Sequence, residues 1–119
     1  LLHNELCNHD VGLALELNSS DYNRQICQTN KLFSYAQAGL YIIATNTIGQ
    51  KKFIDENSHA GMITNEYDKG DIYSVIQNIL YKKDKLKLEK KLRFEKAKSL
   101  AWENESQKLI SSWQDFLKD

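Results

Sequence analysis

The chain has 119 residues, 41% of them hydrophobic and 27% charged, which fits one globular domain with a single core. Its formal net charge is zero, so bulk charge gives no reason to expect a nucleic-acid partner. No apolar run approaches the roughly 18–20 residues of a membrane span, and no signal peptide is visible. The first residue is not Met, and we expect the chain to be part of a longer protein.

The first quarter of the chain alternates a short helix with a short apolar run. Residues 1–9 are typical of the end of a helix, with Leu2 and Leu6 one turn apart. The apolar run 11–17 predicts a buried strand, and the polar residues 18–25 predict a loop that follows it. In open parallel sheets the carboxyl ends of the strands are where ligands bind.

Residues 28–45 predict a polar loop, a short helix, a glycine stop and a second buried strand. Thr29 or Asn30 can cap the helix, and Gly39 can end it because glycine adopts positive φ without strain. The β-branched run 40–45 is the predicted strand.

The start of this helix is the best candidate for a binding site. Free amides at a helix start are fixed donors, and the helix dipole adds roughly half a positive charge. Lys31 would add a full charge, with the polar side chains of Gln28, Thr29 and Asn30 beside it. The alternative is a capped surface helix with a solvated lysine, which composition alone favours. Neither a glycine-rich dinucleotide loop nor a P-loop occurs in the chain.

The middle of the chain continues the alternation. It predicts a short helix over 50–57, a strand over 60–64 and a longer helix over 69–82. Asp68 and Asp71 suit the first turn of the longer helix. This helix carries an apolar stripe made of Ile72, Val75, Ile76, Ile79 and Leu80.

The last third predicts a charged helix over 84–100 and a terminal helix over 101–118. Residues 82–98 hold nine Lys/Arg against three acids, which indicates either a solvated helix face or a patch that attracts acidic lipid head groups. The terminal helix places six large apolar side chains on one side: Trp102, Leu109, Ile110, Trp113, Phe116 and Leu117. Such a stripe is either core packing or a surface that another chain covers.

The order of elements predicts an α/β fold, a Rossmann-like parallel sheet with helices on both faces. Cys7 and Cys27 have no metal-like or redox spacing, so we expect reduced thiols of an intracellular protein. His3, His9 and His59 are scattered along the chain, and no metal site is expected.

A resemblance to a known family follows from residues 30–44, which read N-K-L-F-S-Y-A-Q-A-G-L-Y-I-I-A. This block resembles the donor-binding helix of GT-B glycosyltransferases of the group-1, family 4-like type, which commonly reads N-K-L-F-E-Y-x-A-x-G-L-P-V-I-A. The resemblance covers about residues 10–115. Its weaker supporting features are Asp10 to Leu13, residues 45–50 with Phe53, Ile54 and Glu56, Gly61, Asp68, and Trp102 with Glu103.

The resemblance implies a two-domain enzyme whose C-terminal half binds a nucleotide-diphosphate sugar and whose N-terminal half binds the acceptor. Residues 1–119 would be a single partial domain, the last part of the C-terminal half. The implied reaction moves a hexosyl unit to a glycan or lipid-linked acceptor, as in cell-surface polysaccharide synthesis, generally with retention and without a metal or other cofactor. It implies a cytoplasmic enzyme, or one peripheral at the inner face of the membrane. The helix over 101–118 would pack on the missing N-terminal domain, or form a homodimer without it.

The resemblance also implies roles for residues in the 28–34 segment. Lys31 and the amides near Thr29 and Asn30 would contact the diphosphate of the donor. Ser34 would face the ribose, and Gln28 would line the same loop. No catalytic residue is assigned within this chain.

Four positions depart from the family pattern. Ser34 stands where the family usually has a Glu that holds the ribose hydroxyls, and serine is not a two-oxygen acceptor. Ile26 stands where an acidic residue is common, and Tyr41 and Ile48 replace usual prolines. The change at Ser34 favours the alternative function, a non-catalytic α/β interaction module that uses the terminal helix or the basic helix.

Overall fold

The computed structural model describes residues 1–17, 19, 21–65 and 68–118 and shows a parallel sheet flanked by helices. The strands are β1 (Val11–Ala14), β2 (Tyr41–Thr45) and β3 (Gly61–Thr64), in the order β1-β2-β3. The register aligns Val11 with Tyr41 and Ile42 with Gly61. The three strands confirm the predicted α/β class and the parallel sheet.

Helices fill the connections between the strands and the rest of the chain. α1 precedes β1, α2 and α3 join β1 to β2, α4 joins β2 to β3, and the others follow β3. Their bounds are α1 (Leu2–Leu6), α2 (Tyr22–Ile26), α3 (Asn30–Gln37), α4 (Ile48–Glu56), α5 (Lys69–Tyr81), α6 (Lys83–Leu88), α7 (Lys90–Ala97), a 3-10 turn η1 (Lys98–Leu100) and α8 (Trp102–Lys118).

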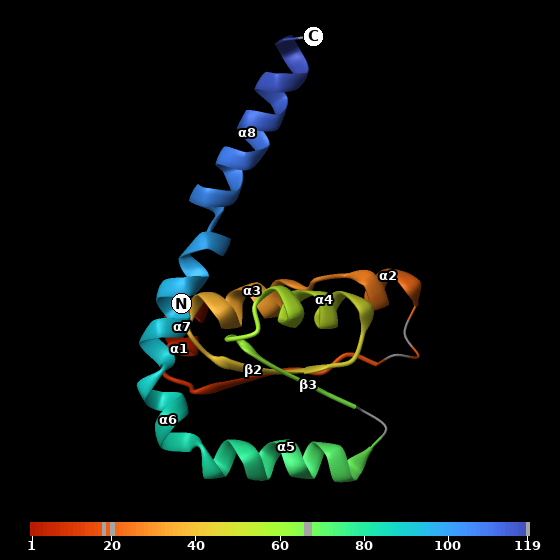
Figure 1. Ribbon diagram of the computed structural model, residues 1–119, viewed down its shortest axis with the longest axis vertical. Helices are drawn as coiled ribbons and strands as arrows, with labels where there is room; N and C mark the ends of the chain where they lie inside the picture. Colours follow the sequence, from red (N-terminus) through yellow and green to blue (C-terminus); the bar gives the residue numbers. More distant parts are fainter. Residues whose placement is uncertain (18, 20, 66–67, 119) are drawn as a thin grey trace.

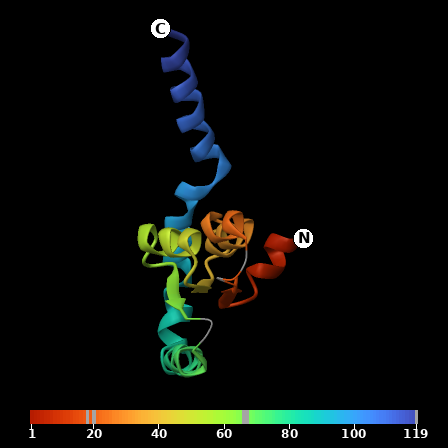
Figure 2. The same ribbon diagram turned by 90° about the vertical axis from the view of Figure 1, so that its right-hand side faces the viewer.

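The helices form a layer on each face of the sheet, as predicted (Figure 1; Figure 2). α3 and α4 lie on one face, and α5 lies on the other, against β3. α5 buries Val75, whereas Ile76 and Leu80 of its apolar stripe are exposed. On β1, Leu13 is exposed as well. The second face of the sheet is therefore only partly covered by this chain.

The core lies between the sheet and the α3–α4 layer. The ring of Phe33 packs edge-on against the ring of Phe53, with centroids 5.3 Å apart. Full burial of a large side chain such as Leu32, Ile42 or Phe53 contributes about 1.5–3 kcal/mol. The buried residues of this core are Ala14, Leu32, Ala36, Ile42, Ala44, Phe53, Ile54, Ala60 and Ala97.

The predicted loop over 18–25 is wrong in its second half, where the chain forms α2. Asp21 starts this helix because its carboxylate accepts the backbone N–H of Arg24 at 3.0 Å. Five residues are too few to show an apolar period, so the pattern could not reveal the helix. Asn18 and Ser20 of the predicted loop lie outside the described residues.

Other boundaries differ from the sequence expectation as well, among them that of the first helix, which ends at Leu6. The strand predicted over 11–17 ends at Ala14, so the apolar run continues for three residues beyond the last residue paired in the sheet. The helix predicted over 50–57 begins at Ile48, because the hydroxyl of Thr47 accepts an N–H of the first turn and caps it there.

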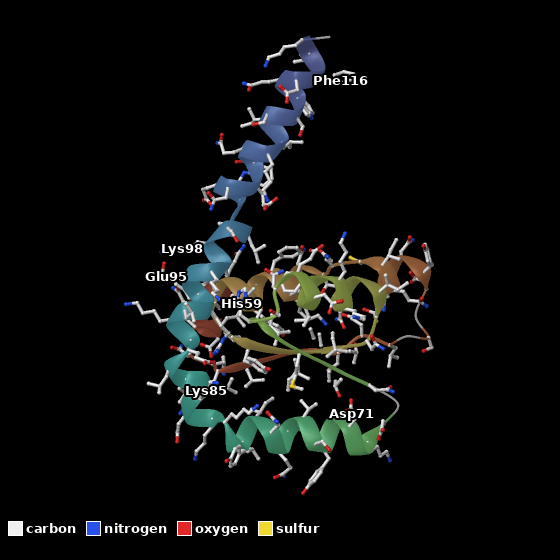
Figure 3. The ribbon with its side chains drawn as sticks, viewed as in Figure 1. His59, Asp71, Lys85, Glu95, Lys98 and Phe116 are labelled. Carbon is white, nitrogen blue, oxygen red and sulfur yellow. The ribbon has the colours of Figure 1, made fainter. Side chains whose placement is uncertain are left out.

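α5 begins where it was predicted to begin. The Asp68 carboxylate accepts the N–H groups of Gly70 at 2.8 Å and Asp71 at 3.1 Å. Asp71 reaches back to the end of β3, where its Oδ2 accepts the N–H of Asn65 at 2.6 Å and the hydroxyl of Thr64 at 2.9 Å (Figure 3). These bonds, first from Asn65 and then from Thr64, lower the pKa of Asp71 because they favour the carboxylate.

The charged helix predicted over 84–100 is not continuous, because α6 and α7 meet at Glu89 and residues 98–100 form η1. The prediction of a solvated helix face over 82–98 is also wrong for Arg93, whose side chain is buried at 3% exposure. Its Nε donates to the carbonyl of Gly39 at 3.0 Å, and an Nη donates to the carbonyl of Leu86 at 2.8 Å. Arg93 thus joins α6 and α7 to the turn before β2.

α8 extends away from the rest of the molecule (Figure 1; Figure 2). Its main contacts are with η1, and the molecule measures 55 × 34 × 26 Å as a result. Its apolar side chains are open to solvent, and Phe116 is 80% exposed near the free end (Figure 3).

Candidate functional site

The candidate site lies at the carboxyl edge of the sheet, where strand ends meet helix starts. β1 ends at Ala14 and β2 ends at Thr45, while α3 begins at Asn30 and α4 at Ile48. In an open parallel sheet this edge is where ligands bind. The structure therefore brings the predicted helix start next to residues from two other segments.

The first turn of α3 has unpaired donors. Thr29 holds the capping position, but its side chain makes no capping hydrogen bond, contrary to the expected cap, and its Oγ1 is buried without a partner. Among the hydrogen bonds of the described residues, none takes up the N–H groups of Asn30 and Lys31. Two amides and the positive end of the helix dipole thus face outward at this point.

Lys31 does not stand free at this helix start. Its Nζ lies 2.8 Å from Oε1 of Glu16, and the Glu16 side chain is only 18% exposed. An ion pair with a partly exposed lysine contributes about 1 kcal/mol or less, so an anionic ligand could displace the carboxylate. Sequence reasoning missed Glu16; the available signal was its place as the single charged residue in the apolar run 11–17.

A polar network behind Glu16 leaves one buried group unpaired. The Thr45 hydroxyl accepts the N–H of Glu16 at 2.8 Å, and lies 2.6 Å from the Glu16 carbonyl and 2.8 Å from Oε1 of Gln50. A hydroxyl has one proton, so it can satisfy only one of these two oxygens. Gln50 is fully buried, and its Nε2 has no partner.

Exchanging the two amide atoms of Gln50 does not remove the problem. Nε2 would then donate to the Thr45 hydroxyl, whose proton would go to the Glu16 carbonyl, and Oε1 would be left unpaired. An unpaired buried amide atom costs about 1–3 kcal/mol, and such groups call for an explanation. Thr29 Oγ1 is a second buried side-chain atom without a hydrogen-bond partner. Among the described residues, such atoms therefore lie at this edge of the sheet.

Close backbone packing fixes the loop that precedes α3. A Cβ on Gly49 would lie 2.3 Å from the carbonyl of Cys27 and 2.5 Å from that of Ile26. Only glycine lets the start of α4 approach the end of α2 this closely. Ile26 therefore contributes backbone packing where the family pattern has an acidic side chain.

The other predicted site residues lie less centrally. Gln28 is half-buried in the segment before α3. Ser34, one turn along α3 from Lys31, lines a hollow of about 290 Å³ whose other walls include Leu2 and His3 of α1. The structure thus gathers Thr29, Asn30 and Lys31 at the helix start and places Ser34 beside α1.

The structure also describes the cysteines and the side chains that could hold a metal ion. Cys7 and Cys27 are both unpaired thiols, as predicted. Across residues 1–17, 19, 21–65 and 68–118, no His, Cys, Asp and Glu side chains gather in a group that could hold a metal ion. In the same ranges no helix is long and apolar enough to cross a membrane.

Comparison of the chain with protein-family models, with curated proteins and with solved structures gives no match in any of the three.

Proposed function

We propose that this chain carries part of the donor site of a nucleotide-sugar-dependent glycosyltransferase, with the start of α3 receiving the diphosphate. The observation that carries the proposal is the pair of unpaired amides beside Lys31 at the carboxyl edge of a parallel sheet. Free amides and a cation on a helix dipole are the chemistry that binds phosphate oxygens. The resemblance of residues 30–44 to the donor-binding helix supports the same function.

Each residue at the site then has a role. The amides of Asn30 and Lys31 and the Nζ of Lys31 hold diphosphate oxygens, and the diphosphate competes with Glu16 for Lys31. Thr29 and Gln28 line the loop. Ser34 faces the ribose with a single hydroxyl, which gives it a weaker hold on that sugar than a carboxylate would have.

In this proposal, the residues that bind the acceptor belong to another part of a longer protein. An N-terminal half of a longer protein supplies the acceptor site for a glycan or lipid-linked acceptor, and a hexosyl unit is transferred between the halves. We expect binding but no transfer from the 119-residue chain alone. The proposed setting is the cytoplasm, at or near the inner face of the membrane.

The test is calorimetric titration of the protein with UDP and GDP, and then of its Lys31→Ala variant. Lys31→Ala should weaken binding by about 10- to 100-fold, the usual loss for a charge-assisted contact. Glu16→Gln should strengthen binding, because it releases Lys31. The matched control is Lys51→Ala, another exposed lysine in an ion pair, with Asp55 at 2.7 Å. If neither nucleotide binds, or if Lys31→Ala and Lys51→Ala have the same effect, the site assignment fails.

A second candidate function rests on α8. This helix exposes an apolar side that nothing in the described structure covers, including Trp113 and Phe116. Hollows of about 480 and 360 Å³ lie along the same side. Such a side suits a protein partner, either the N-terminal half of a longer protein or a second copy.

A further inference from the structure

Residues 82–98 carry an excess of positive charge that the candidate site does not use. They hold nine Lys/Arg against three acids, and the buried Arg93 accounts for only one of the nine. The remaining eight are lysines, and seven of them are exposed, while Lys90 is half-buried. Lys85 on α6 and Lys98 on η1 mark the two ends of this charged α6–α7–η1 column (Figure 3). We call this surface the lysine face.

Nearby acids neutralise only part of the lysine face. Lys85 pairs with Glu89 at 3.7 Å, and Lys98 pairs with Glu95 at 2.7 Å. Asp10 lies 4.0 Å from the ammonium groups of both Lys87 and Lys90, so one carboxylate serves two cations. Among the described residues, those without an ion pair on this face are Lys82, Lys83, Lys91 and Lys96.

Three of the eight lysines line a hollow that also has apolar walls. Lys87, Lys90 and Lys91 line a hollow of about 380 Å³ together with Ala38 and Phe94. Lys90 is held in place, since its Nζ donates to the carbonyls of Cys7 and His9. Lys87 and Lys91, which also line the hollow, make no such bonds to backbone carbonyls of the described residues. The hollow lies beside the carboxyl end of α3, so it is separate from the candidate site at that helix's start.

Exposed apolar side chains accompany the charge. Leu88 is 84% exposed and Leu92 is 53% exposed, both on the same two helices. The pKa of His59 is lowered, first by burial and then by the charges of Lys96 and Arg93, so a lysine of this face lies near that ring.

We propose that the lysine face docks the protein onto an anionic membrane surface. Long flexible lysines attract a field of lipid head groups without needing one geometry, and exposed leucines can enter the interface between head groups and acyl chains. Inorganic phosphate would make no favourable contact with the apolar walls of the hollow or with Leu88 and Leu92, whereas a lipid surface would. Binding is peripheral, and it does not depend on the function proposed for the start of α3.

The test is co-sedimentation with vesicles of phosphatidylcholine alone and with vesicles that also contain about 30% phosphatidylglycerol. The variant Lys87→Gln with Lys91→Gln should lower the partition coefficient on anionic vesicles by about 20- to 30-fold, since each lysine near such a surface contributes roughly a fivefold factor. Salt of about 0.5 M should abolish most of the binding.

The control is Lys51→Gln with Lys52→Gln, which makes the same charge change at exposed, ion-paired positions on α4 and should leave binding unchanged. The apolar side of α8 would bind neutral and anionic vesicles alike, so the ratio between the two isolates the lysine face. Circular dichroism checks that both variants fold. Equal binding to both vesicle types, equal loss in the control, or a response to inorganic phosphate without vesicle binding would each overturn the proposal.

Discussion

Gly39 and Arg93 together fix the turn that joins α3 to β2. Gly39 has a φ of 74°, and a Cβ there would lie 2.8 Å from the carbonyl oxygen of Lys90. Its own carbonyl accepts the Nε of Arg93, whose guanidinium also lies 5.7 Å from the centre of the Tyr41 ring. One glycine therefore combines an unusual backbone angle with close contact to α7.

Gly39→Ala should lower the free energy of unfolding by about 2–4 kcal/mol. Roughly 1–2 kcal/mol comes from the left-handed backbone conformation, and the rest comes from displacing α7. Gly70→Ala is the control, because Gly70 lies in the first turn of α5 without positive φ and a Cβ there would press only on the Asp68 side chain, 3.1 Å from its Oδ1, so it should change stability far less than Gly39→Ala. Urea unfolding followed by circular dichroism measures both. Equal midpoints for Gly39→Ala and the unchanged protein would refute this account of the turn.

Residues whose role is local could be predicted from the sequence, and residues whose role depends on distant segments could not. Gly39 and Asp68 were both predicted, because a helix stop and a helix cap act within a few positions. Arg93 looks like its neighbouring lysines until the fold places it under Gly39, 54 positions away. Glu16 and Gln50 are joined only through Thr45, so their network has no sequence signature.

At the scale of elements, the strands and long helices follow their apolar periods, and the departures occur where that period is weak. The break at Glu89 falls in a stretch rich in lysine, where no apolar repeat enforces a single helix. α8 is the opposite case: its helical pattern is clear and the helix forms, but the pattern does not say what its apolar side contacts. The structure leaves that side open.

The exposed side of α8 should make the isolated chain self-associate. Trp113→Glu should shift it to monomers, since losing a tryptophan from the centre of an interface typically costs 2 kcal/mol or more, about a 30-fold change in the dimer dissociation constant. Gln107→Glu adds the same charge to α8 away from the hollows and should change nothing. Sedimentation velocity over a range of concentrations measures the effect. If the chain stays monomeric at every concentration, the prediction is wrong and the apolar side of α8 does not bind a second copy.

At the scale of the whole molecule, the sheet is narrow and open. Strand–helix alternation predicted a parallel sheet, and the crossovers place α3 and α4 together on one face. The sequence could not indicate which strand borders which, or that β1 would pair only with β2 among the described residues. The exposed Leu13 lies on this edge strand, where neither α5 nor another strand covers it.

The open edge of β1 has a consequence for amide hydrogen exchange. In a parallel ladder, alternate residues direct their N–H groups to opposite sides of the strand. The N–H of Tyr41 donates to the carbonyl of Asp10, which aims the amides of Gly12 and Ala14 at β2 and those of Val11 and Leu13 outward. The outward pair should exchange about 100-fold faster or more than the inward pair when followed by NMR in heavy water. Four equally slow amides would show instead that a further strand occupies this edge in solution.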